Sequence, residues 1–385
     1  MQIGVPAETT AGETRVSVTP ETAKKLAAQG HAIRVQSGAG LTATITDAAY
    51  EAAGCQITDA AGALGADLVL KVRSPSEFEL PLMKSGATVV GMLNPFDTAA
   101  MQRLAAAGLT GFALEAAPRT TRAQSMDVLS SQANIAGYKA VMVAADRYQR
   151  FFPMLMTAAG TVKAARVVVL GVGVAGLQAI ATAKRLGAVI EASDVRPSVK
   201  EQVESLGGKF IEVTYDTPEE KEAAVGVGGY ARPMPASWLA RQQIEVARRI
   251  AQADIVIATA LIPGRAAPTL VTAEMVRSMK PGSVIVDLAA GRGADEDGGT
   301  TGGNCTLSEP DRTVVKHGVT IVGETNLAAR VAADASALYA RNVLDFLKLI
   351  LPKDAAQASV TIDLDDDIVA ACLVTRGGEI RRKGA

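Results

Sequence analysis

Histidine, cysteine and aromatic residues are scarce in this sequence of 385 residues. There are two histidines and three cysteines, aromatic residues make up 4%, and the formal net charge is −1. The cysteines, Cys55, Cys305 and Cys372, lie far apart without metal-ligand spacing, so we expect no metal site and reduced thiols in a cytoplasm-like compartment. A net charge this close to zero provides no electrostatic case for binding nucleic acid or an anionic membrane.

A signal peptide and a membrane-spanning run are also missing. The longest apolar stretch, residues 167–183, is interrupted by three glycines and Gln178, and its pattern is that of a strand, a turn and a helix. The first residues, MQIGVPAETTAGETR, contain no basic segment followed by an apolar core. We therefore expect a cytoplasmic protein, and if it works at a membrane another chain must hold it there.

Short apolar runs alternate with helical stretches along the chain, which predicts βα units and parallel sheets. The chain is too long for one ordinary core, so two domains are expected. In the N-terminal region, strands are predicted at 3–5, 32–36, 68–72, 88–93 and 109–114, and helices at 20–29, 47–53 and 97–107. A second α/β unit begins with a strand at 166–170, and further strands are predicted at 188–194, 209–213, 254–260, 283–289 and 320–323.

Two long helical patterns, at 127–150 and 332–350, are predicted to connect these units, and residues 370–375 could add a strand to the first. We expect an α/β protein of two Rossmann-like, doubly wound parallel-sheet domains joined by long interdomain helices. The first domain is discontinuous, comprising residues 1–125 and 335–385, and the second, dinucleotide-binding domain comprises residues 126–334.

A glycine fingerprint, G-x-G-x-x-G, lies at residues 171–176. It follows a strand and opens a helix, and the next strand ends in Asp194 at the spacing that dinucleotide-binding sites require. Gly171 makes the tight turn, Gly173 allows the backbone to approach the pyrophosphate, and Gly176 allows the helix to pack closely on the strand. The helix N-terminus supplies N–H groups to the phosphates, so dinucleotide binding is predicted.

The choice between the two nicotinamide dinucleotides depends on Asp194. Its carboxylate should accept hydrogen bonds from the adenosine ribose and repel a 2′-phosphate, which favours NAD over NADP. Arg196 could instead accommodate that phosphate, or it could be a salt-bridge partner or a solvated charge. The two histidines, His31 and His317, each lie in a turn before a strand, and we interpret both as structural.

A polar segment at residues 119–138, RTTRAQSMDVLSSQANIAGY, lies between the expected domains. Physically it is a loop that caps the following helix, with Ser125 or Asp127 as the N-cap. The segment closely resembles the NAD(H)-binding component of the proton-translocating transhydrogenases. The resemblance covers essentially the whole chain, through further motifs at 156–188, 205–210 (SLGGKF), 228–234 (GGYARPM), 259–264 (TALIPG), 279–289 (MKPGSVIVDLA) and 302–305 (GGNC).

The resemblance implies roles for individual residues. Arg119, Asp127 and Ser130 would hold the nicotinamide carboxamide, and Gln124 would reach toward the NADP(H) presented by a partner. Tyr230, with Gly229, matches a mobile loop that closes over bound nucleotide. The positions that match the lining of the NAD site are Val172, Gly173, Val174, Asp194, Val195, Arg196, Gln242 and Leu261.

The same resemblance implies the activity and the partners. Hydride would pass directly from NADH on this chain to NADP⁺ on a separate domain, a step that needs positioning and exclusion of water but no side-chain acid or base. The hairpin-like segment 156–166 would cross to the other subunit of a homodimer. Because this sequence stops at Ala385, the NADP(H)-binding and membrane-spanning components are expected on separate chains, which would hold it at the inner membrane. Residues 291–303 form a glycine-rich insertion relative to the family pattern.

Two other functions are compatible with parts of the sequence. The fold also resembles alanine dehydrogenase, and Lys71 lies where that family has a substrate-binding lysine. That family also requires a catalytic histidine shortly after the next strand, and residues 90–95 (VGMLNP) contain none. A non-catalytic NAD sensor could use the same glycine-rich loops. A sensor would show no turnover with an NADP(H)-binding partner, whereas an amino-acid dehydrogenase would work without one.

Overall fold

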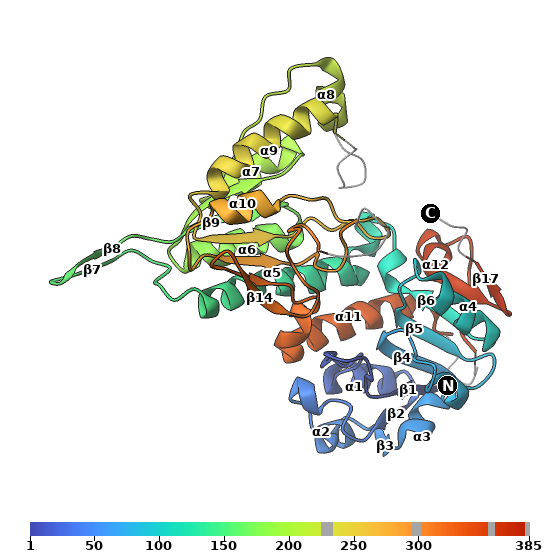
Figure 1. Cartoon of the computed structure of the whole chain (residues 1–385). Coiled ribbons are helices and arrows are strands. Elements are labelled where there is room, and N and C mark those ends of the chain that lie inside the picture. The colour runs from blue at the N-terminus through green and yellow to red at the C-terminus, as the bar shows by residue number, and fades with distance from the viewer. Residues whose placement is uncertain (225–233, 295–301, 353–358, 382–385) are drawn as a thin grey trace. The chain divides into compact units, whose positions relative to one another are not determined.

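The computed structural model describes residues 1–224, 234–294, 302–352 and 359–381 (Figure 1). It contains two compact units, one of Met1–Gln132 with Ala328–Ala385 and one of Ala133–Leu327. The chain passes from the first unit to the second within helix α5 (Val128–Arg147). Each unit is built on its own mainly parallel sheet, which confirms the predicted fold class.

The first unit has an eight-stranded sheet in the order β17-β16-β6-β5-β4-β1-β2-β3. Its strands are β1 (Gln2–Val5), β2 (Ala32–Gln36), β3 (Gln56–Thr58), β4 (Leu68–Arg73), β5 (Thr88–Met92), β6 (Thr110–Ala113), β16 (Leu373–Arg376) and β17 (Glu379–Ile380). Strands β1 to β6 are parallel, and β16 and β17 are antiparallel additions at one edge. The order of the parallel strands reverses between β1 and β4, as in a doubly wound fold.

Short helices and one long helix complete the first unit. They are α1 (Pro20–Ala28), α2 (Asp47–Ala52), α3 (Ala60–Leu64), α4 (Thr98–Ala106), α11 (Ala332–Ile350) and α12 (Asp367–Cys372), with 3₁₀ helices η1 (Leu41–Ala43), η2 (Leu80–Leu82), η3 (Leu114–Ala116) and η4 (Thr121–Met126). Helix α1 begins as predicted, because the Thr19 hydroxyl accepts from the Thr22 N–H and Pro20 occupies the first helical position. The strand predicted over 370–375 was partly wrong: residues 370–372 belong to α12, which Asp366 caps, and the strand begins at Leu373.

The second unit repeats the doubly wound order with a seven-stranded sheet, β11-β10-β9-β12-β13-β15-β14. Its strands are β9 (Arg166–Leu170), β10 (Val189–Ser193), β11 (Lys209–Phe210), β12 (Ile255–Ala258), β13 (Val284–Asp287), β14 (Thr313–Lys316) and β15 (Val319–Val322), and β14 alone is antiparallel. Its helices are α6 (Val174–Arg185), α7 (Lys200–Ser205), α8 (Pro218–Ala224), α9 (Ala236–Ile250) and α10 (Ala273–Ser278), with η5 (Pro197–Val199) and, at the return to the first unit, η6 (Leu327–Val331). Strand β11 is shorter than the predicted 209–213.

Both faces of the second sheet are buried at its central strands, which explains why β9, β12 and β13 are largely apolar. Alternate residues of a strand point to opposite faces. Val167 and Val169 of β9 therefore join one hydrophobic cluster with residues of α5 and α6, whereas Val168 and Leu170 join another with residues of α9 and α10. This packing fixes the carboxyl end of β9, where the order of the strands reverses.

A separate hairpin, β7 (Leu155–Thr157) with β8 (Gly160–Val162), projects from the rest of the second unit (Figure 1). Its side chains are mostly exposed, including Met156. Within the described parts of the chain, no helix combines the length and the apolar character needed to cross a membrane. The same described residues contain no group of three or more His, Cys, Asp or Glu side chains that could hold a metal ion.

Candidate functional site

The glycine fingerprint forms the turn between β9 and α6. Gly171 has φ +88°, and its N–H donates to the carbonyl of Ser193 at 2.9 Å. A Cβ on Gly176 would lie 2.0 Å from the Gly171 carbonyl oxygen, so close packing of helix on strand requires glycine there. A Cβ on Gly173 would meet no protein atom within 4 Å. The packing of the protein therefore accounts for glycine at 171 and 176 but not at 173.

Gly173 is also the N-cap residue of α6. It has no side chain with which to satisfy the first N–H groups of the helix, and Val174 follows as the first helical residue. The helix N-terminus also carries partial positive charge. The turn is thus suited to an anionic group that approaches the backbone closely.

Asp194 follows β10 directly and lies beside this turn. One carboxylate oxygen accepts from the Val172 N–H at 2.7 Å, and the other accepts from the Arg196 N–H at 2.9 Å. The Arg196 guanidinium donates to both oxygens, at 2.9 and 3.0 Å, and to the Val172 carbonyl at 3.1 Å. These bonds raise the pKa of Arg196, and the Asp194 side chain is only 8% exposed. Of the roles considered for Arg196, the structure shows the salt bridge.

Three other predicted lining residues lie in the second unit. Gln242 of α9 is buried and donates from Nε2 to the Ser193 hydroxyl at 3.1 Å, next to Asp194 in the chain. Val195 packs against a small cluster that contains Trp238, and Leu261, after β12, is exposed. The structure therefore gathers Val172, Asp194, Arg196 and Gln242 around the ends of β9 and β10.

A buried polar cluster in the second unit was missed by the sequence reasoning. Asp287, the last residue of β13, accepts from the N–H groups of Ala289, Asn304 and Cys305 and from the Ser308 hydroxyl. The Asn304 side chain in turn binds both the N–H and the carbonyl of Ala260. Burial raises the pKa of Asp287. The hydrogen bonds of this cluster connect the loop after β12 to the loop after β13. The only signal for the cluster in the sequence was the GGNC motif at residues 302–305.

The polar segment with Arg119, Gln124, Asp127 and Ser130 lies in the first unit. Asp127 caps α5, because its carboxylate accepts from the Ser130 N–H at 2.8 Å and from the Ser130 hydroxyl at 2.6 Å. Asp127 rather than Ser125 is thus the capping residue. Arg119 and Gln124 are exposed. Tyr230 and Gly229, and residues 295–301 of the insertion, lie outside the described residues.

Lys71, the residue of interest for an amino-acid dehydrogenase, is a buried structural cation. Its Nζ lies 2.6 Å from a Glu79 carboxylate oxygen and 3.5 Å from a Glu8 oxygen. Residues 90–95 contain no histidine, and in this stretch the Asn94 N–H donates to Glu115 at 2.6 Å. Burial raises the pKa of Glu115 to about 7. Glu79 and Glu8 of the same chain therefore pair with the Lys71 ammonium.

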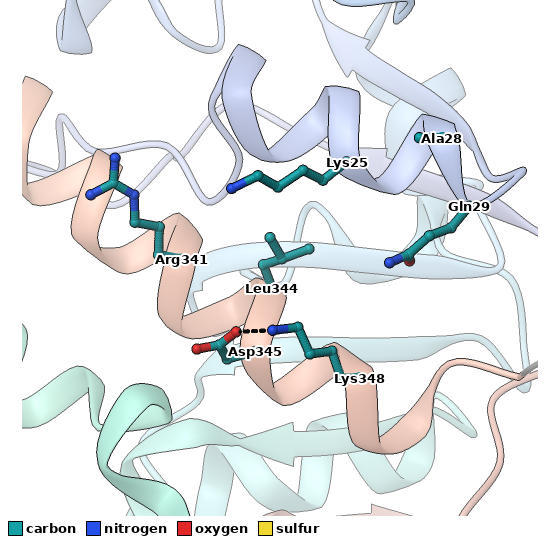
Figure 2. Close-up of a pocket in the computed structure, with 7 residues that line it drawn as sticks. All are labelled: Lys25, Ala28, Gln29, Arg341, Leu344, Asp345 and Lys348. Carbon is teal, nitrogen blue, oxygen red and sulfur yellow. Dashed lines mark hydrogen bonds and ion pairs between the residues drawn. The ribbon is translucent and has the colours of Figure 1, made fainter.

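A surface pocket of about 620 Å³ lies between α1 and α11 in the first unit (Figure 2). It contains none of the predicted site residues. Each of its cations has an acidic partner: Glu21 binds both Lys25 and Arg341 at 2.9 Å, and Asp345 binds Lys348 at 2.5 Å. The pocket therefore has no unpaired positive charge for an anionic ligand among its lining residues.

Two family models match this chain, the alanine dehydrogenase/PNT N-terminal domain over residues 4–136 and the C-terminal domain over residues 140–383. The chain belongs to the alanine dehydrogenase/PNT family. Within this family it is 50% identical to a component of NAD(P) transhydrogenase subunit alpha from Rhodospirillum rubrum, over 99% of this chain and 97% of that protein. The crystal structure of transhydrogenase from Sinorhizobium meliloti matches with a TM-score of 0.87 and 48% identity, over 99% of this chain and 100% of that one.

The alanine dehydrogenase branch of the family is more distant. Alanine dehydrogenase of Bacillus subtilis is 29% identical, over 99% of this chain and 92% of that protein. The resemblance to transhydrogenase noted in the sequence is therefore confirmed. These relatives are named as a dehydrogenase and transhydrogenases, and the name of the Rhodospirillum rubrum relative includes the nicotinamide nucleotides NAD(P).

Proposed function

We propose that this chain is the NAD(H)-binding subunit of a proton-translocating transhydrogenase. The observation that carries the proposal is the turn at Gly173. A Cβ there would meet no protein atom at the N-terminus of α6, and Asp194 binds the N–H of the neighbouring Val172. Bound NADH supplies the hydride, which passes directly to NADP⁺ on a partner domain. The 50% identity to a transhydrogenase subunit supports this choice within the family.

The residues of the second unit bind the adenosine and pyrophosphate groups of NAD(H). Gly171 and Gly176 shape the turn, and Val172, Gly173 and Val174 bring the backbone and the start of α6 to the pyrophosphate. Asp194 exchanges its bonds with Arg196 for bonds from the ribose hydroxyls and disfavours a 2′-phosphate. The remaining lining residues are Val195, Arg196, Gln242 and Leu261.

The residues of the first unit orient the nicotinamide ring. Arg119, Asp127 and Ser130 hold its carboxamide, and Gln124 reaches toward the NADP(H) on the partner. Tyr230, with Gly229, closes over the nucleotide. No proton moves in a hydride transfer, so these side chains act through positioning and exclusion of water rather than as acids or bases.

The assembly follows from the same proposal. The hairpin of β7 and β8 crosses to a second copy of the chain, and the exposed Met154 and Met156 supply its apolar surface. The NADP(H)-binding and membrane-spanning components belong to separate chains. Those chains hold this one in the cytoplasm at the inner membrane, and proton translocation takes place in the membrane component.

Mixing the chain with an NADP(H)-binding transhydrogenase domain tests the function. We expect hydride exchange between NADH and NADP⁺ only when both proteins are present. NADH binding without turnover would indicate a sensor. Turnover of an amino acid with NAD⁺ in the absence of a partner would indicate a dehydrogenase. The ion pairs of Lys71 with Glu79 and Glu8 and the absence of histidine from residues 90–95 argue against that reaction.

A further inference from the structure

Gln124 lies on a short helix whose own hydrogen bonds stabilise it poorly, so contacts with other segments must contribute to its stability. This helix, the 3₁₀ helix η4, is six residues long, and 3₁₀ runs longer than about four residues are uncommon because their hydrogen-bond geometry is poor. Thr120 at its N-cap makes no side-chain capping bond. Ala123 and Met126, three residues apart, are buried in the core of the first unit, which leaves Gln124 exposed.

Three side chains from the C-terminal segment of the first unit form two supports for η4, an ion-pair cluster around Arg122 and a bond from Asn342. Arg122 of η4 pairs with Asp366, at 2.7 Å for each of two bonds, and with Asp367. The Arg122 side chain is 48% exposed, so water and salt screen this pairing. Asn342 of α11 is only 8% exposed, and its Nδ2 donates to the Ser125 carbonyl at 2.7 Å. Because Asn342 is itself buried, breaking this bond leaves its amide without a partner away from water, so the Asn342 contact is the stronger of the two supports.

Asn342 also binds the start of α5. Its Oδ1 accepts from the Ser131 hydroxyl at 2.7 Å, and the same hydroxyl accepts from Gln132 Nε2 at 3.3 Å. Gln132 in turn accepts from the Arg15 guanidinium at 2.7 Å, and Arg15 forms two short bonds with Glu13. This buried chain of bonds fixes the orientation of the Ser131 hydroxyl and therefore of the Asn342 amide.

We propose that Asn342 is a positioning residue for hydride transfer, because its amide holds the Ser125 carbonyl and the Ser131 hydroxyl at a fixed separation. Gln124 precedes Ser125 and Ser130 precedes Ser131, so the amide sets the spacing between a residue that reaches the NADP(H) side and one that holds the nicotinamide. In this proposal Asn342 acts only through its bonds to Ser125 and Ser131. This inference rests on the proposed function, in which Gln124 and Ser130 have those roles.

The test compares two variants that break the bonds with two that keep them. Asn342→Leu removes both bonds at similar volume, and Ser131→Ala removes one. Ser131→Thr retains the hydroxyl, and Arg341→Ala changes the neighbouring residue of α11, which binds Glu21 instead. The measurements are single-turnover hydride transfer to NADP⁺ on the partner domain and equilibrium binding of NADH.

We expect Asn342→Leu to slow transfer about a hundredfold, since a displacement near 1 Å can have that effect, and Ser131→Ala to slow it about tenfold. The dissociation constant for NADH should change less than about threefold, because most binding energy comes from the residues around Gly173 and Asp194. Ser131→Thr and Arg341→Ala should keep the parental rate.

Three results would overturn the proposal. One is parental transfer in both Asn342→Leu and Ser131→Ala. Another is a loss of NADH affinity as large as the loss of rate, which would show a general structural role. The third applies if Asn342→Leu fails to fold, as judged by circular dichroism. The test is then the comparison of Ser131→Ala with Ser131→Thr, and equal transfer rates in these two variants refute the proposal. Absence of transfer in the parental protein would refute the proposed function itself and this inference with it.

Discussion

Replacing Asp194 by alanine should reverse much of the preference for NADH over NADPH. In the free protein the carboxylate accepts from the Val172 N–H and from three N–H groups of Arg196. In the proposed complex, hydroxyls of the NADH ribose would replace the two guanidinium bonds. Removing the carboxylate would deprive these hydroxyls of a charged acceptor, and a hydrogen bond to a charged group contributes about 1.5–3 kcal/mol. Because about 1.4 kcal/mol corresponds to tenfold in affinity, Asp194→Ala should weaken NADH binding by about 10- to 100-fold.

The same change should strengthen NADPH binding. It removes the repulsion between the carboxylate and the 2′-phosphate, and it releases the guanidinium of Arg196 to pair with that phosphate. Isothermal titration calorimetry with both nucleotides measures the ratio of the two affinities. Asp194→Asn is an informative intermediate, since it keeps an acceptor for the Val172 N–H at 2.7 Å but removes the charge.

Glu191 of β10, the strand that Asp194 follows, provides a matched control. Its carboxylate pairs with Arg166 at 3.4 Å and Arg249 at 3.7 Å, away from the glycine turn. Glu191→Gln should leave the ratio of NADH to NADPH affinity unchanged. Equal binding of both nucleotides by the parental protein, or an unchanged ratio in Asp194→Ala, would refute the assignment of Asp194 as the residue that selects NADH.

Three further predictions follow from the geometry. Gly173→Ala should fold normally and weaken NADH binding, whereas Gly176→Ala, whose Cβ would approach a backbone oxygen to 2.0 Å, should lose about 1–3 kcal/mol in urea unfolding. Equal stability of these two variants would contradict this reasoning. Gln124→Asn should slow single-turnover hydride transfer about a hundredfold and leave NADH affinity nearly unchanged. Arg119→Ala should lower both the transfer rate and the NADH affinity. A parental transfer rate in Gln124→Asn would show that Gln124 does not belong to the site. The raised pKa of Glu115 means that the folded protein binds a proton more readily than the unfolded chain, so stability should fall as the pH rises from 4.5 to about 7. That fall, at most about 3 kcal/mol, should be absent in Glu115→Gln, and an identical pH profile in the two proteins would argue against it.

Local pattern alone was sufficient to predict the glycine turn between β9 and α6. The strand, the three glycines, the helix and Asp194 follow one another within a single βαβ unit, and each contact among them depends on nearby backbone geometry. The doubly wound fold class followed from the alternation of strand and helix patterns for the same reason. Helix ends with a capping residue, such as Thr19 before α1, were equally local.

Tertiary structure decided everything that depends on which strand ends and helices become neighbours. The switch from helix to strand at 372–373 depends on pairing of β16 with β6, which lies far away in the chain. Asn342 meets Ser125 across a separation of 217 residues. No periodicity records such a contact, because hydrophobic pattern reports only which face of an element is buried and not which polar groups the fold brings together.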